Sequence, residues 1–190
     1  PLGLLLVGAI TAGILLGISS RSIGTGYLAW IALLPMVFAL TGTRSYLVGS
    51  LIGWISWLGI GMTVFEGSLP VLPWAFPVLV AVSGLWWAAA GAFFVWVLQR
   101  IGTVAALATF PFALVAMEFI SSQRRLFGDV ANVLGGLGYT QFDTPLISLA
   151  ALSSVSAISL IVVGINVKLL IAFRFRIFVG LLIIGALVSA

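Results

Sequence analysis

The sequence predicts an all-α protein, a polytopic bundle of about seven transmembrane helices. Of its 190 residues, 63% are hydrophobic and only 6% are charged, and the mean hydropathy is +1.34. Soluble domains carry about 25% charged residues, so most of this surface does not face water. Long apolar runs recur along the chain, without the alternation of a β-barrel. We therefore expect residues 1–190 to form a single transmembrane helical domain.

Seven apolar segments support this fold class. They cover residues 1–18, 27–40, 46–65, 71–98, 103–119, 146–170 and 177 onward. The second is shorter than the roughly 20 residues of a full span, so we expect it to be tilted or to pair with the first as a hairpin. Pro73 and Pro77 predict a kink near the start of the fourth. The chain starts at Pro1 and stops within an apolar run, so we expect a longer polypeptide.

Glycine spacing predicts close helix packing. Gly13-x-x-x-Gly17 and Gly49-x-x-x-Gly53 would each let two helix backbones approach closely. Packing within the chain is the simpler interpretation, and a homodimer interface is the alternative. Tryptophans near the segment ends are expected to anchor the helices at the membrane interface.

The distribution of basic residues predicts the orientation in the membrane. The second, fourth and sixth loops between segments carry five of them, Arg44, Arg100, Lys168, Arg174 and Arg176. The first, third and fifth loops carry three, Arg21, Arg124 and Arg125. The positive-inside rule then predicts a cytoplasmic N-terminus. After seven spans, the C-terminus and the loop over about 121–145 would lie outside. Basic residues scattered singly at segment ends do not indicate a nucleic-acid partner.

Several chemistries are improbable from composition alone. The chain contains no cysteine and no histidine, and only four carboxylates. It therefore lacks a thiol nucleophile and the commonest metal ligand and general base. We expect no catalytic residue, no metal site and no cofactor within these residues.

One stretch is unusually polar for this chain. Residues 124–146, "RRLFGDVANVLGGLGYTQFDTPL", hold two of the eight basic and two of the four acidic residues. A surface loop with glycine turns, in which Asp129 caps a helix or pairs with Arg124 or Arg125, would account for it. The loop is long, however, and "LGGLGYTQF" is apolar enough to re-enter the membrane edge.

Glu118 lies just before this stretch, near the end of the fifth apolar segment, where an ionised carboxylate is costly. At helical spacing, Glu118, Ser122 and Arg125 share one face. Two interpretations stay open, a structural ion pair with Arg125 and a functional acid.

These residues resemble the apolipoprotein N-acyltransferase family. Glu118 and Phe119 precede a basic loop, then "GYTQFDTPL" at 138–146 and "GINVKLL" around Asn166. Near the N-terminus, "YLAWIALLPMVFAL" and "GSLIGWISWLGIG" are similar to its second and third spans. The order and spacing of these motifs cover essentially the whole chain as the membrane half of such an enzyme.

The resemblance implies an eight-helix membrane domain with a nitrilase-like domain inserted outside the membrane after the seventh helix. The family transfers an acyl chain from phospholipid to the N-terminal amine of a lipoprotein, through a thioester on a cysteine in the nitrilase-like domain. That domain is absent from these 190 residues, so we expect this chain alone to be inactive. The residues expected to bind substrate at the mouth of a lipid-facing cleft are Glu118, Arg124, Arg125, Tyr139 and Gln141.

Two other functions remain open. Asn132, Val133 and Leu134 replace an aromatic family motif, which favours a non-catalytic structural subunit of a larger membrane complex that inherited this fold. An unrelated transporter or channel would need charges in the middle of its spans, and these are almost absent. Membrane lipids, with a lipoprotein or neighbouring membrane subunits, are the expected partners. The bacterial inner (plasma) membrane is the expected location.

Overall fold

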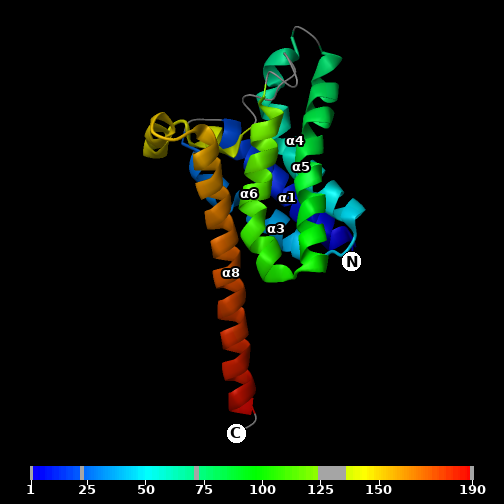
Figure 1. Cartoon of the computed structure of the whole chain (residues 1–190), viewed down its shortest axis with the longest axis vertical. Helices are drawn as coiled ribbons and strands as arrows, with labels where there is room; N and C mark the ends of the chain where they lie inside the picture. The colour runs from blue at the N-terminus through cyan, green and yellow to red at the C-terminus, as the bar shows by residue number, and fades with distance from the viewer. Residues whose placement is uncertain (1, 22–23, 71–72, 124–135, 189–190) are drawn as a thin grey trace.

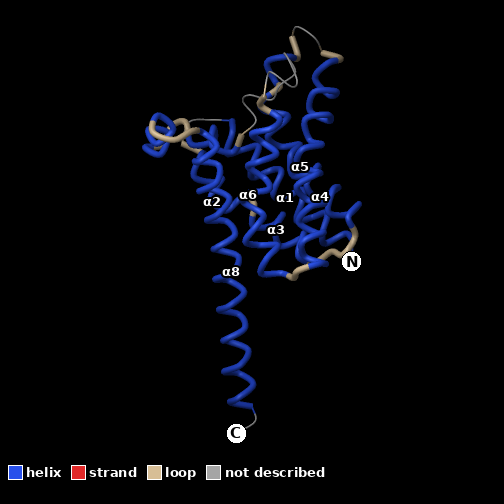
Figure 2. Tube along the Cα trace, in the orientation of Figure 1, coloured by secondary structure: helices blue, strands red, loops and turns tan. Residues whose placement is uncertain are grey.

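A computed structural model describes residues 2–21, 24–70, 73–123 and 136–188, with side chains as far as residue 174. All regular structure in these ranges is helical, as Figure 2 shows. Five helices are long and apolar enough to span a membrane: α1 (Leu2–Arg21), α4 (Tyr46–Val64), α5 (Ala75–Arg100), α6 (Thr103–Ser121) and α8 (Val155–Val188). With the short α2 and α3, the described residues form seven α-helices, which confirms the predicted all-α membrane fold.

The second apolar segment does not form one helix. It divides into η1 (Gly26–Leu28), α2 (Ala29–Ala32) and α3 (Leu34–Thr41). The break falls at Leu33 because Pro35 lacks an N–H and its ring would clash with the carbonyl four residues earlier. The Leu33 N–H instead donates to Oδ1 of Asn166 on α8, at 3.0 Å.

The sixth and seventh apolar segments join in α8, so the sequence prediction of a turn between them is wrong. Arg174 and Arg176 interrupt the hydropathy there, but arginine is a good helix former and no glycine or proline lies nearby. A helix of 34 residues is about 50 Å long, against about 30 Å of membrane hydrocarbon. Its second half extends well past the bundle, beyond the end of the bundle at which the N-terminus lies (Figure 1).

Helices α1, α4 and α5 pack closely, with α4 in contact with both neighbours. Gly13 lies against Ile55 of α4, and Gly53 against Trp87 of α5. The tightest approach is at Gly59, where an added Cβ would lie 1.7 Å from the Gly13 carbonyl oxygen. Both predicted glycine pairs thus pack within the chain, as the simpler interpretation expected.

Two mid-helix tryptophans reinforce this contact. Trp57 and Trp87 are fully buried, with their ring centroids 5.8 Å apart. The Trp57 indole N–H donates to the Val80 carbonyl and to Ser83 Oγ, at 3.1 and 3.0 Å. Trp74, one residue before α5, is 70% exposed, in keeping with an interfacial position.

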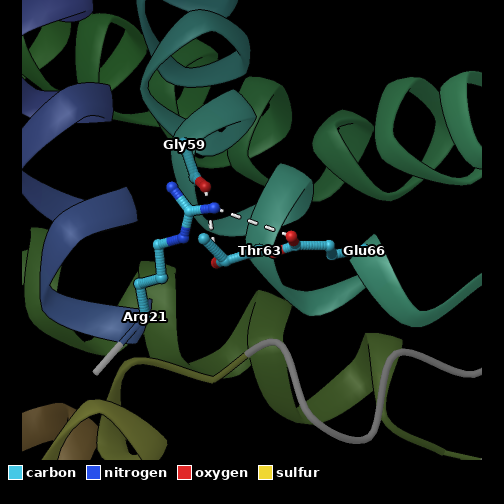
Figure 3. Close-up of polar contacts among 4 residues, drawn as sticks. All are labelled: Arg21, Gly59, Thr63 and Glu66. Atoms are coloured by element: carbon cyan, nitrogen blue, oxygen red, sulfur yellow. Dashed lines mark hydrogen bonds and ion pairs between the residues drawn. The ribbon is translucent and has the colours of Figure 1, made fainter. Parts of the chain in front are cut away.

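The remaining short elements lie at the end of the bundle opposite the N-terminus (Figure 1). They are η2 (Glu66–Ser68), η4 (Leu137–Gln141) and η5 (Pro145–Ala151). An exposed ion pair joins Arg21 at the end of α1 to Glu66 of η2 (Figure 3). Non-helical and 3-10 backbone is therefore concentrated at the end of the bundle opposite the N-terminus. The candidate site lies at this end.

Candidate functional site

Glu118 is the centre of the candidate site. It lies in the last turn of α6 and only 7% of the residue is exposed. Its Oε1 accepts a hydrogen bond from the Leu137 N–H at 3.1 Å, which joins α6 to η4. Its Oε2 is buried without a hydrogen-bond partner of normal geometry in the described chain, although the Ser159 hydroxyl lies beside the carboxylate. One carboxylate oxygen is therefore structural, and the other has no partner of normal geometry among the residues that the structure describes.

A polar pocket of about 120 Å³ adjoins this carboxylate. Its lining residues are Glu118, Ser122, Gly136, Tyr139, Val155, Ser156 and Ser159. A Cβ added to Gly136 would lie 3.5 Å from Glu118 Oε2 and 3.7 Å from Ser159 Oγ, so the glycine keeps this space open. A water molecule takes about 30 Å³ in the liquid, so the pocket has room for a few waters or a small polar group.

The lining determines what the pocket can bind. Hydroxyl groups both donate and accept hydrogen bonds, whereas the free Glu118 oxygen offers an acceptor or a negative charge. A ligand group with several N–H or O–H donors suits this set. Within the described ranges, no three His, Cys, Asp or Glu side chains come together in a way that would hold a metal ion.

The structure brings some of the predicted site residues together in one pocket, and others lie outside the described residues. Glu118 in the last turn of α6 and Ser122 directly after this helix line the same pocket, and Tyr139 of η4 lines it with them. Arg124 and Arg125 lie outside the described residues, and so does Asp129. The proposed ion pair of Glu118 with Arg125 therefore stays a prediction.

Gln141 lies apart from the pocket lining. Its side chain is fully buried, and its amide nitrogen donates to the Gly26 carbonyl at 2.7 Å and to Thr140 Oγ1 at 3.0 Å. Nearby, Asp143 Oδ2 accepts a hydrogen bond from the Gly24 N–H. These contacts attach η4 and the residues after it to the chain between α1 and α2.

Ser159 and Asn166 of α8 are buried polar residues that the sequence did not identify as part of the site. Ser159 Oγ accepts from the Gly138 N–H at 2.7 Å, which fixes η4 over the pocket. Asn166 Nδ2 donates to the Ala29 and Val162 carbonyls, both at 2.9 Å. An asparagine within an apolar span was a usable signal, because polar residues there need partners. Serine gives no such signal, since it occurs widely in membrane helices.

Comparison with known proteins supports the resemblance seen in the motifs. The chain is 30% identical over 170 aligned residues to an apolipoprotein N-acyltransferase of Geobacter metallireducens. This alignment covers 85% of the chain but only 32% of the relative, so the chain spans about a third of that protein's length. No solved structure matches the chain.

Residues 12–168 match the family described as the apolipoprotein N-acyltransferase N-terminal domain. This match includes the second half of α1, all of α2 to α6, and the part of α8 that carries Ser159 and Asn166. It therefore covers both the bundle and the candidate pocket. The chain is an integral membrane protein that belongs to the apolipoprotein N-acyltransferase N-terminal domain family.

Proposed function

We propose that this chain is the membrane domain that positions a phospholipid and a lipoprotein N-terminus for N-acylation by a catalytic domain outside these residues. The relative's printed name supplies the activity, and the polar pocket at Glu118 is the observation that supports a substrate role here. Its free carboxylate oxygen and its hydroxyls lie at one end of the bundle, where a lipid headgroup region would be.

The proposed orientation places this pocket outside the bacterial inner membrane. Arg44 and Arg174 contact the N-terminal end of the bundle, through the Leu98 carbonyl and Thr41 Oγ1. Arg100 ends α5 at the same end. This excess of basic residues favours a cytoplasmic N-terminal end. The pocket, at the opposite end, would then face the outer leaflet.

Within this function the predicted site residues take different roles. Glu118 and Tyr139 line the pocket and are proposed to contact a polar group of the substrate. Arg124 and Arg125 are proposed to bind a lipid phosphate, which arginine recognises well. Gln141 is fully buried against Gly26, so we propose that it supports η4 and does not touch substrate.

The test is acyl transfer by the full-length protein, reconstituted with phospholipid and a lipoprotein acceptor. Gly136→Leu would fill the pocket beside Glu118, and Tyr139→Ala and Arg125→Ala would remove proposed contacts. The two contact deletions are each expected to lower acyl transfer by about five- to 150-fold while membrane insertion stays normal, since a lost charged or polar contact costs about 1–3 kcal/mol. Gly136→Leu should lower it as well, because its side chain would occupy the proposed substrate space.

Ser148→Ala is the matched control, because Ser148 is exposed on η5 and bonds only its own helix. It should leave transfer unchanged. Normal activity in Gly136→Leu and Tyr139→Ala would contradict the proposed role of the pocket. If the wild-type full-length protein transfers no acyl chain, the non-catalytic structural subunit becomes the better assignment.

A further inference from the structure

A second hollow lies at the end of the bundle opposite the Glu118 pocket. It is an apolar groove of about 610 Å³ between α1, α3 and α8. Its walls include Leu5 and Gly8 of α1, Leu34 and Phe38 of α3, and Leu170 and Phe173 of α8. The volume is within the roughly 300–1,000 Å³ of ligand pockets, and the lining suits a hydrocarbon chain.

Arg174 provides a cation at the mouth of this groove. The Arg174 guanidinium lies 5.6 Å from the centre of the Phe38 ring, and Nη2 donates to Thr41 Oγ1. A guanidinium carries five N–H donors, so several are left for another acceptor. Of the carboxylates in the described chain, Glu66, Glu118 and Asp143, none lies at this end.

Along α1 the groove covers about two thirds of the depth of one membrane leaflet. Along α1 its lining runs from Leu4 to Thr11, which is about 10 Å at 1.5 Å per residue. Half of a hydrocarbon core of about 30 Å is about 15 Å. An acyl chain entering beside Arg174 would therefore follow the groove towards the middle of the membrane.

We propose that this groove binds an anionic phospholipid of the leaflet at the N-terminal end, with an acyl chain along α1 and the phosphate on Arg174. Arginine recognises phosphate through its planar pair of donors, and basic pockets between transmembrane helices bind anionic headgroups. The site is separate from the proposed substrate pocket and does not depend on acyl transfer.

The experiment is native mass spectrometry of the purified protein in detergent, with dioleoyl phosphatidylglycerol or dioleoyl phosphatidylcholine. Both have the same acyl chains and a phosphate, but the glycerol headgroup leaves the first lipid anionic and the choline headgroup makes the second zwitterionic. Wild-type protein should retain phosphatidylglycerol at least about tenfold more strongly. Arg174→Gln should abolish this preference. Arg100→Gln, which removes an exposed cation at the same end but outside the groove, should not.

A second pair of variants tests the groove itself. Val7→Trp would fill the groove from α1, and it should reduce retention of both lipids. Val104→Trp is the matched control, since Val104 is 83% exposed on α6 and lies outside the groove. The proposal is overturned if Arg174→Gln keeps the preference, if both lipids bind equally to the wild type, or if Val7→Trp retains lipid like Val104→Trp. A protein dimer in place of lipid adducts would likewise overturn it.

Discussion

Two parts of this bundle are held together by different kinds of contact. In the first part, the continuous helices α1, α4 and α5 meet through glycine. Gly59 of α4 faces the Gly13 carbonyl of α1. Gly91 of α5 faces Gly49 of α4 so closely that a Cβ added to Gly91 would lie 2.2 Å from the Gly49 carbonyl oxygen. Side-chain hydrogen bonds across these crossings, such as that from Trp57 to the Val80 carbonyl, add to the glycine contacts. They do not replace missing backbone bonds, because a continuous helix satisfies its own backbone groups.

In the second part the backbone is broken, and buried polar side chains complete its hydrogen bonds. Asn166 bonds Ala29 and Leu33 around the gap between α2 and α3. Gln141 bonds Gly26 ahead of that gap. The membrane core offers no water to such groups, so the protein has to supply the partners itself.

This contrast teaches how to judge a buried polar residue in the bundle. Asn166 and Gln141 bond backbone groups of a broken segment, which is a sufficient structural reason for their presence. Glu118 also bonds backbone, through Oε1, but its Oε2 opens beside a pocket. All three residues are buried, so burial does not distinguish Glu118. It differs from Asn166 and Gln141 because its Oε2 can still accept a hydrogen bond from a ligand.

The largest expected effect comes from breaking the glycine contact. Gly59→Leu would place a side chain where even a Cβ lies 1.7 Å from the Gly13 carbonyl oxygen, so α1 and α4 would have to separate. Overpacking a tight core costs typically about 1–3 kcal/mol, and this site has backbone on the other side. We expect a loss of about 3 kcal/mol or more in the free energy of unfolding, measured by denaturant titration in detergent.

Gly164→Leu is the control for this change. Gly164 lies on α8, and a Cβ there meets nothing within 4 Å. The same substitution should leave the free energy of unfolding nearly unchanged. Equal destabilisation by both variants would show that the loss follows from replacing a helical glycine and not from the crossing of α1 and α4.

Removing a hydrogen-bonding side chain from the broken region should have the next largest effect. Asn166→Leu keeps a similar volume but leaves the Leu33 N–H and the Ala29 carbonyl without their partner. Each buried polar group left unpaired costs about 1–3 kcal/mol, so for two such groups we expect a loss of at least about 2 kcal/mol. Ile165→Leu, one position earlier, should change stability by less than about 1.5 kcal/mol. A stable Asn166→Leu protein would mean that the gap between α2 and α3 does not need this side chain.

Two glutamines sharpen the comparison further. Gln141 is fully buried and bonds Gly26 across 115 residues of sequence. Gln123 is half-buried and bonds locally, to the carbonyl of Phe119 four residues earlier. We expect Gln141→Ala to lower the free energy of unfolding by about 1–2 kcal/mol and Gln123→Ala by less than about 0.5 kcal/mol. Hydrogen exchange at η4 should rise in Gln141→Ala alone, and a rise in neither variant would contradict this anchoring role.

Sequence alone predicted the parts of the fold that depend on hydropathy and spacing. The apolar runs gave the long helices, and Gly13 and Gly17 indicated a close crossing that the structure places against α4. Sequence did not predict Gly59 as their partner, because the glycine pair recognised on α4, Gly49 and Gly53, packs against α5 instead. The sequence also predicted a turn before residue 177, because hydropathy falls at the arginines there. The helix propensity does not fall at these residues, and α8 continues through them.

The candidate site was predictable in its location more than in its contacts. Glu118 and Tyr139 were both expected there, since polar residues in an apolar chain are few. Their meeting point depends on how η4 folds back onto α6 and α8, which no local pattern encodes. Gln141 was expected to contact substrate because it is a polar residue in the same stretch. Its contact with Gly26 depends on the folding of η4, so the sequence did not indicate that this side chain is buried there.

The smallest expected effect belongs to the ion pair between Arg21 and Glu66, shown with Thr63 and Gly59 in Figure 3. The charged atoms are 3.6 Å apart, but the two side chains are 71% and 55% exposed. Water and salt screen such a pair, which contributes about 0–1 kcal/mol. Arg21→Gln should therefore lower the free energy of unfolding by less than about 1 kcal/mol, and raising the salt concentration should reduce even this difference. A loss as large as that of Asn166→Leu would show that Arg21 has a partner stronger than Glu66, and the contrast between packed and hydrogen-bonded regions would then have to include charge.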